Sequence, residues 1–185
     1  MKSPKYVIIG LVVILVLFIG FLFLRGDKND SLKEEEKEDL YESYEKYDSV
    51  DWGFEIKYPK DWESQIVGED ESGLAIAFLA PSANILVYAF KSSDKDFDEL
   101  MASGIADFSS SGERNLISDR KTTISGSPAY ELIYSSSNLD GEFKYLHYFI
   151  NAGERWYQIL YTAEEGQYEK SLETAEMIIR SFRIL

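Results

Sequence analysis

The chain has 185 residues, enough for one domain of ordinary size and an additional segment. It contains 33 Asp and Glu against 19 Lys and Arg, a formal net charge of −14, which argues against general binding to nucleic acid because phosphate contacts require clustered basic residues. Cysteine is absent and histidine occurs once, which excludes disulfides, thiolate nucleophiles and zinc sites built on cysteines or several histidines. Aromatic residues make up 15% of the chain, so we expect a packed core.

The longest apolar stretch lies near the N-terminus. Residues 6–24 carry no charge, and 19 residues in a helix extend about 28 Å, the thickness of the hydrocarbon core of a bilayer. A cleaved signal peptide is the alternative, but its apolar stretch is usually about 7–15 residues long and ends at small residues, whereas this one ends at Phe21-Leu22-Phe23-Leu24-Arg25. The sequence therefore predicts a transmembrane anchor over residues 1–25, which binds the lipid bilayer through residues 6–24.

Charges on the two sides of this stretch predict its orientation. Lys2 and Lys5 precede it, whereas Arg25 follows it and is soon joined by acidic residues. Because positive charge is enriched on the cytoplasmic side of membrane helices, we expect a cytoplasmic N-terminus. The rest of the chain is then extracytoplasmic, in a protein that crosses the cell membrane once.

Residues 26–48 have a composition of their own. They include ten acidic and four basic residues, a net charge of −6, and the run KEEEKEDLYESYEKY is rich in helix-forming residues. We expect a solvated, partly helical stalk between the anchor and the domain. An acidic tail that binds a specific partner is the alternative.

Residues 49–185 form the predicted domain, and most of it shows strand patterns. The clearest is 53–58, in which Phe54, Ile56 and Tyr58 alternate with charged residues. Turn-forming residues separate the other apolar runs, so that the strands from 115 onward are expected to form an antiparallel meander. The further strand candidates are residues 74–79, 85–90, 115–124, 129–135, 142–150 and 155–162.

Two segments show helical periodicity. The first begins near Asp94 with a possible capping box of Ser93 and Asp96, and the second covers about residues 165–181. The tail at 182–185 is expected to form a final turn or a short edge strand. These elements predict an α+β fold in which helices pack on the faces of an antiparallel sheet.

Acidic motifs suggest cation sites at two places, and both have a simpler explanation. Asp94-x-Asp96-x-Asp98 is similar to the start of a calcium loop, but the glycine and the final glutamate of such a loop are missing. Asp residues at the start of a helix are expected to cap it instead. Glu69-Asp70-Glu71 is expected to lie in a solvated turn. We therefore predict no metal site, no cofactor and no catalytic residues, since nucleotide-binding, hydrolase and metalloprotease motifs are also missing.

Aromatic residues in the meander are the best candidates for a binding surface. Ring faces on a sheet can form a groove for a glycan, a peptide or a lipid, although strand aromatics more often form the core and cross-strand pairs. The single imidazole lies among them and is a candidate general base or metal ligand, with an ordinary sheet residue as the favoured interpretation. The candidate ligand-binding or partner-binding residues are Tyr130, Tyr134, Tyr145, His147, Trp156 and Tyr157.

Three short segments resemble PsbP-like domains. Residues 54–62 (FEIKYPKDW) resemble the family's opening motif, aromatic-x-x-x-Tyr-Pro-x-x-Trp, and residues 123–131 (TISGSPAYE) resemble its strand–Gly–strand step. Residues 155–161, with Ser181-Phe182 after the second helix, are also similar. The resemblance implies the Mog1/PsbP-type α/β/α sandwich and a non-catalytic accessory role, since family members assist photosystem assembly or bind small GTPases. A photosynthetic role is not carried over, because this chain has an anchor, an acidic stalk and no set of metal-binding histidines.

Together these features predict a membrane-anchored, extracytoplasmic, non-catalytic binding or accessory module. Its expected partner is a protein complex of the membrane or the envelope. One alternative is a ligand-binding sensor or carrier that uses the aromatic face of the sheet. Another is a carboxylate-dependent hydrolase, which requires two carboxyl groups about 5–10 Å apart in a cleft.

Overall fold

The computed structural model describes residues 41–92, 96–110, 114–138 and 141–185. Within these residues, no helix is long and apolar enough to cross a membrane. The predicted anchor at 6–24 lies outside the described residues, as does the predicted stalk up to residue 40.

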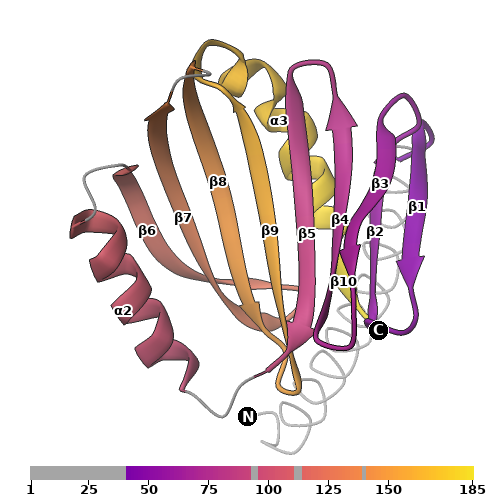
Figure 1. Ribbon diagram of the computed structural model, residues 1–185. Helices are drawn as coiled ribbons and strands as arrows, with labels where there is room; N and C mark the ends of the chain where they lie inside the picture. The colour runs from indigo at the N-terminus through magenta and orange to yellow at the C-terminus, as the bar shows by residue number, and fades with distance from the viewer. Residues whose placement is uncertain (1–40, 93–95, 111–113, 139–140) are drawn as a thin grey trace, which may run out of the picture. The chain divides into compact units, whose positions relative to one another are not determined.

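A large antiparallel sheet forms the centre of the domain (Figure 1). Strand partners along the chain confirm the predicted meander, because β6, β7, β8 and β9 are successive neighbours. The predicted hairpin of residues 74–79 and 85–90 is confirmed as β4 and β5. In spatial order the seven strands of this sheet in the described chain are β3 (Glu63–Glu69), β4 (Gly73–Ala80), β5 (Ala83–Lys91), β9 (Arg155–Glu164), β8 (Gly141–Asn151), β7 (Ser127–Asn138) and β6 (Arg114–Ile124).

One face of this sheet is covered by helix α3 (Glu165–Ser181) and by a small second sheet. The small sheet has the order β1 (Tyr44–Ser49), β2 (Phe54–Pro59) and β10 (Arg183–Ile184). Strand β10 pairs with β2, so the C-terminal tail forms a short edge strand and not a final helical turn. Helix α3 has the predicted bounds and buries the apolar face that its periodicity indicates.

Strand β1 corrects the predicted boundary between stalk and domain. Residues 44–48 were expected in a solvated, partly helical stalk, but they form a strand, and the compact unit begins at Tyr44. The Tyr47 ring packs 5.9 Å from Phe54 and 6.0 Å from Phe78, measured between centroids. Lys46, on the exposed side, forms ion pairs with neighbouring carboxylates. Tertiary contacts with the tyrosines therefore outweigh the helical preference of a charge-rich sequence.

Strand β3 was not predicted either. All of its residues are exposed, including Ile66 and Val67, which are 51% and 52% exposed. An edge strand with no buried face has no reason to alternate between apolar and polar residues, so the sequence carries no period-2 signal there.

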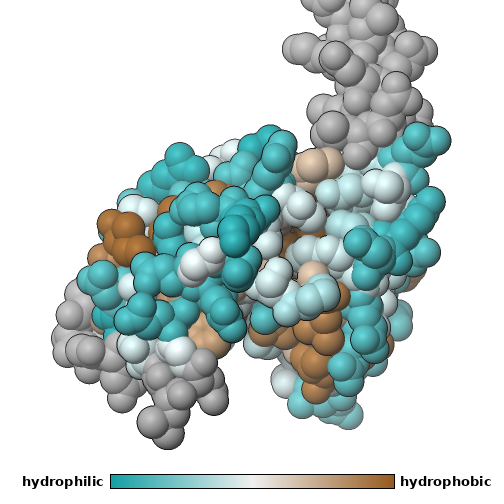
Figure 2. All heavy atoms as spheres, turned by 90° about the horizontal axis from the view of Figure 1, so that it is seen from above, coloured by the Kyte–Doolittle hydropathy of each residue, from teal (hydrophilic) through white to brown (hydrophobic). Residues whose placement is uncertain are grey.

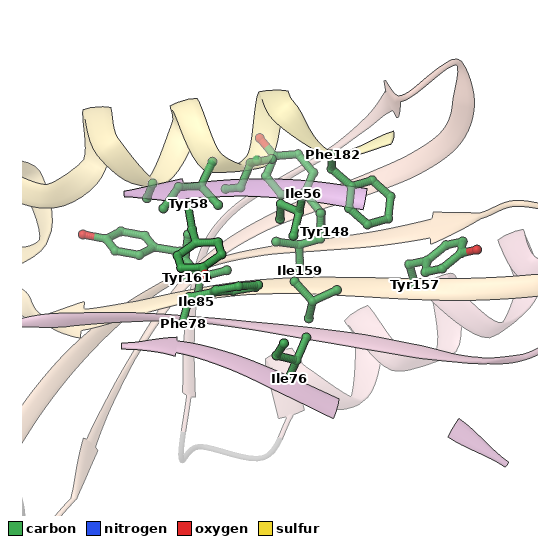
Figure 3. Close-up of a cluster of buried hydrophobic side chains, with 14 of the residues drawn as sticks. Ile56, Tyr58, Ile76, Phe78, Ile85, Tyr148, Tyr157, Ile159, Tyr161 and Phe182 are labelled. Atoms are coloured by element: carbon green, nitrogen blue, oxygen red, sulfur yellow. The ribbon is translucent and has the colours of Figure 1, made fainter. Parts of the chain in front are cut away.

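The main core lies between the large sheet and the layer formed by α3 and the small sheet (Figure 3). Phe54 and Phe182 stack with ring centroids 5.5 Å apart, and both contact Tyr157 edge-on. The Tyr157 hydroxyl donates a hydrogen bond of 3.0 Å to the Trp52 carbonyl, which ties β9 to the segment before β2. Phe182, one residue after α3, therefore joins the helix, both sheets and the C-terminal strand.

A pair of buried tyrosines in this core gives a stability prediction. The Tyr161 hydroxyl donates a 2.8 Å hydrogen bond to the Tyr168 carbonyl, whereas the buried Tyr168 hydroxyl finds no partner among the described residues. A buried polar group without a partner costs free energy, so Tyr168→Phe should raise the free energy of unfolding by about 1 kcal/mol. Tyr161→Phe is the matched control and should lower it by about 1 kcal/mol. Urea denaturation measures both, and a Tyr168→Phe variant as destabilised as Tyr161→Phe would contradict the prediction.

Helix α2 (Phe97–Ser110) packs on the opposite face of the large sheet, which completes the α/β/α arrangement. The Glu99 amide donates a 2.9 Å hydrogen bond to the Asp96 side chain, so Asp96 itself caps the helix. This corrects the predicted capping box, in which Ser93 was the cap; Ser93 lies outside the described residues. Phe97 and Met101 are buried on the predicted inner face, whereas Leu100 is 37% exposed.

Candidate functional site

An apolar groove of about 340 Å³ lies between α2 and the large sheet. Helix α2 contributes one wall, and strands β5, β7, β8 and β9 contribute the other. Its size is within the usual range for small-molecule sites, which are mostly apolar clefts of about 300–1,000 Å³. Residues that line it include Leu100, Met101 and Gly104 from the helix and Phe90, Phe149 and Trp156 from the sheet.

The groove exists because α2 covers only part of its side of the sheet. The helix lies along β6 and the neighbouring end of the sheet, and no described helix lies in front of β4 and β5 (Figure 1). Seen from above, the surface of the domain is hollowed between hydrophilic flanks, and hydrophobic residues reach the surface beside the hollow (Figure 2). Apolar surface of this kind on a folded domain commonly marks a binding site.

Gly104 keeps the helical wall open. It lies on the groove side of α2, and a Cβ atom added there would meet no atom within 4 Å. Glycine in the middle of a helix costs about 0.5–1 kcal/mol relative to alanine. The space that it leaves can therefore be filled by a larger side chain without a clash in the folded domain.

Edge-on aromatic contacts close the end of the groove near the start of α2. The Phe97 ring lies 5.5 Å from Trp156 and 5.8 Å from Tyr130. Asp98 next to it accepts hydrogen bonds from Lys121 at 2.7 Å and from the Tyr130 hydroxyl at 2.9 Å. These bonds lower the pKa of the Asp98 carboxyl, with the Lys121 contact as the largest cause. Asp98 is thus held by protein donors, as expected for a structural role at a helix start.

The six predicted binding residues are divided between two faces of the sheet. Five of them lie on the α2 face, where four are mainly packed against other side chains and Trp156 lines the groove. Tyr157 also borders the groove, but its hydroxyl reaches the main core on the other face. The five on the α2 face are Tyr130, Tyr134, Tyr145, His147 and Trp156.

Two of these residues illustrate the packing interpretation. Tyr134 and Tyr145 are cross-strand partners whose rings stack 4.6 Å apart, and Tyr134 also meets Phe108 of α2 edge-on. Their rings therefore support the helix. The tyrosines of β7 and β8 are cross-strand and helix contacts, as is usual for aromatic residues in sheets.

His147 is buried beside the groove, with 8% of its surface exposed. Its Nε2 atom lies 3.1 Å from Oε1 of Gln158, and because an amide oxygen can only accept, the ring donates through Nε2. Nδ1 has no partner among the described residues. Burial lowers the pKa of His147 to about 4, so the ring is neutral at pH 7. No group of three or more potential metal ligands occurs in the described part of the chain.

Residues of the groove that the sequence did not single out as binding candidates include Phe90, Leu132, Phe149, Gln158 and Gly104. They come from four different strands and from helix α2. The helical spacing of residues 97–108 indicates an apolar face, but such a face is also typical of ordinary core. The only local signal was the glycine inside an otherwise regular helical pattern.

A second hollow, at the opposite end of β4 from the β4–β5 turn, is polar. It is lined by five carboxylates, two basic side chains and Trp52. All five carboxylates are exposed, and hydrogen bonds from Ser72 lower the pKa of one of them, Asp70. The general acid of a glycosidase is typically held in a poorly solvated pocket, whereas these five carboxylates are exposed. The turn predicted at Glu69-Asp70-Glu71 lies between β3 and β4 but spans residues 70–72, since Glu69 is the last residue of β3 and pairs with Leu74.

Comparison with known proteins agrees with this architecture. The family model described as PsbP matches residues 42–184. The chain belongs to the PsbP family. The match starts just before β1 and ends within β10, so it includes every strand and helix of the described domain. No curated protein matches the chain.

Three solved structures show the fold of this PsbP-family chain at low sequence identity. The cyanobacterial PsbP (CyanoP) of Synechocystis sp. PCC 6803 is 19% identical, with a TM-score of 0.59 over 77% of this chain and 93% of that one. LpqN of Mycobacterium tuberculosis, involved in cell envelope biogenesis, is 14% identical, with a TM-score of 0.56 over 71% and 82%. The Pseudomonas aeruginosa protein PA94, a putative regulator, is 14% identical, with a TM-score of 0.53 over 75% and 94%. The predicted PsbP-like fold is thus confirmed.

Proposed function

We propose that this protein is a non-catalytic binding module tethered to the outer face of the cell membrane by residues 6–24, and that the groove under α2 is its binding site. The observation that carries the proposal is the groove itself, an open hollow with almost entirely apolar walls. The charge-free run of residues 6–24 supports the tether. Membership of the PsbP family, with LpqN and CyanoP as structural neighbours, supports an accessory role.

The chemistry of the groove supports binding over catalysis. Besides the Trp156 indole and the Tyr157 hydroxyl, which donates to the Trp52 carbonyl, Gln158 has the one polar side chain among the lining residues, and an amide is neither an acid nor a base. His147 beside it is neutral at pH 7 and donates to Gln158. A hydrolase would need an activated nucleophile or a pair of carboxyl groups at this place.

The proposal has two forms, which differ in what the groove binds. In the first, the module assists a membrane or envelope protein complex, whereas in the second it carries a small apolar ligand. Co-purification from native membranes distinguishes them, with the tagged full-length chain compared with a chain that starts at residue 42, before β1. A stoichiometric protein retained by both would support the first form. The absence of such a protein would leave the carrier form, which the apolar lining of the groove favours.

The groove is tested by filling it. Gly104→Leu should reduce binding of N-phenyl-1-naphthylamine, an uncharged apolar dye, by at least tenfold, because the leucine side chain would occupy the space next to Met101 and Phe149. The measurement is a fluorescence titration of the full-length protein in nanodiscs, corrected for dye in empty nanodiscs. Ala102→Leu is the control, since Ala102 is exposed on the same helix and should leave binding unchanged. Equal binding by the two variants would refute the groove as the site.

A further inference from the structure

The polar group on the groove wall has a defined orientation. Gln158 lies on β9 next to Phe149 of β8, its cross-strand partner on the groove face. Its Oε1 atom accepts the hydrogen bond from His147, at 3.1 Å. The NH2 end of the same amide is therefore the end left to donate, and no described residue accepts from it. The groove wall thus presents an amide donor in largely apolar surroundings.

His147 holds this orientation. The imidazole is buried and has Gln158 as its hydrogen-bond partner in the described chain, while the Phe149 ring packs 4.0 Å from it. Rotation of the Gln158 amide by 180° would require the other tautomer of His147, in which Nε2 accepts and Nδ1 carries the proton. Nδ1 is buried and has no partner among the described residues, so this arrangement would leave a buried N–H without an acceptor and is disfavoured.

The charges around the groove oppose an anionic ligand. Helix α2 has Asp98 and Glu99 in its first turn and no basic residue in its last turn. No charged side chain lines the groove. Lys121, near the start of the helix, is paired with Asp98, and Arg114 lies against the Phe108 ring, 4.6 Å from its centroid, at the other end of α2. The whole chain carries −14. A carboxylate or phosphate beside Gln158 would therefore enter an acidic domain and find no charged side chain in the groove wall to pair with it.

We propose that the groove binds a single alkyl chain of a membrane lipid whose head group is uncharged and carries an oxygen acceptor, and that the Gln158 amide donates a hydrogen bond to this oxygen. A volume of about 340 Å³ suits one chain better than two. The inference rests on the proposed function, because it names the ligand class of the same groove. Gln158 is then the residue that selects the head group, whereas the apolar lining residues bind the alkyl chain and do not distinguish between head groups.

Photo-crosslinking in a bilayer tests the proposal with the full-length chain. The protein in phosphatidylcholine nanodiscs is exposed to one of three probes that share the same diazirine-bearing chain: a monoacylglycerol, the corresponding fatty acid, and the alkane without a head group. Mass spectrometry then quantifies label on peptides from α2 and β9, relative to label elsewhere on the same molecules. Gly104→Leu and Gln158→Leu are compared with the exposed control Ala102→Leu.

The expected result is that the monoacylglycerol labels the groove at least fivefold more than the fatty acid does. Gly104→Leu should abolish this label, and Gln158→Leu should reduce it about three- to tenfold while it leaves label by the alkane unchanged. Equal label by all three probes, insensitive to Gln158→Leu, would overturn the head-group inference and leave the groove as an apolar site. No label in the groove by any probe would overturn the lipid inference, and the dye titration would decide separately whether the groove binds at all. Crosslinking of the groove to a protein in native membranes, in place of lipid, would also contradict this inference.

Discussion

Phe182→Ala is expected to lower the free energy of unfolding by about 3–5 kcal/mol, the usual cost of truncating a fully buried phenylalanine. The side chain has no exposed surface. It packs against Phe54 of β2 and Tyr157 of β9, with ring centroids 5.5 Å and 5.4 Å away. Because these neighbours belong to different sheets, they cannot close the space left by the ring without moving a strand. Chemical denaturation followed by tryptophan fluorescence measures the effect.

Leu185→Ala is the matched control for this substitution. Leu185 lies three residues further on and is 62% exposed, so its truncation should change the stability by less than about 0.5 kcal/mol. Similar effects of the two substitutions would mean that the C-terminal tail does not join the sheets in solution.

Glu131→Gln is expected to destabilise the protein by about 2 kcal/mol at pH 7. Glu131 is 6% exposed and accepts two hydrogen bonds of 2.7 Å from Arg120 and a further one from the Tyr148 hydroxyl. Hydrogen bonds to a charged group contribute more than neutral ones, and glutamine can keep only some of these. We expect a loss of only about 2 kcal/mol because the Arg120 side chain is 68% exposed, and solvent weakens its interaction with Glu131.

The ionisation of Glu131 predicts how the stability difference between the wild-type protein and Glu131→Gln depends on pH. Burial raises the pKa of Glu131, but the hydrogen bonds from Arg120 and Tyr148 outweigh it, so that the pKa of the folded protein lies below the ordinary value. A lowered pKa stabilises the folded state above the pKa of the unfolded chain, and this stabilisation is lost as the pH falls through the folded value. The glutamine variant has no such titration. The difference in the free energy of unfolding between the two proteins should therefore have its maximum value at pH 7 and should become smaller below about pH 4.

Urea denaturation of both proteins at several pH values measures this effect. Glu176→Gln is the control, since the Glu176–Arg180 pair is an exposed i,i+4 ion pair that should contribute about 0.5 kcal/mol or less. A Glu131→Gln penalty that is constant across this pH range would show that the carboxylate charge does not stabilise the folded domain.

Much of the fold could be predicted from the spacing of apolar residues within single segments of the sequence. Strand β2 alternates apolar and charged residues, and helix α3 repeats apolar residues at helical spacing, because each buries one face against the core. The turn at Ser125-Gly126 is predicted by composition, and both residues have the positive φ angles that such a turn requires. Strand β1 is rich in charged residues and shows no clear alternation of apolar and polar residues. It forms a strand because it pairs with β2 and because Tyr47 packs against Phe78.

The candidate site, like the fold, could be predicted only in part from the sequence. Sequence by itself determined the acidic charge, the lack of cysteine chemistry, the apolar run at 6–24, the meander and the PsbP resemblance, since each depends on composition or on neighbours along the chain. Only the tertiary structure decided which aromatic rings pack in the core and that Gly104 of α2 lines the same groove as Phe149 and Gln158 of the sheet. The physical reason is that a groove is space left between surfaces. Its presence depends on how far α2 lies from strands that include β8 and β9, which are distant in the chain, and no local pattern encodes that distance.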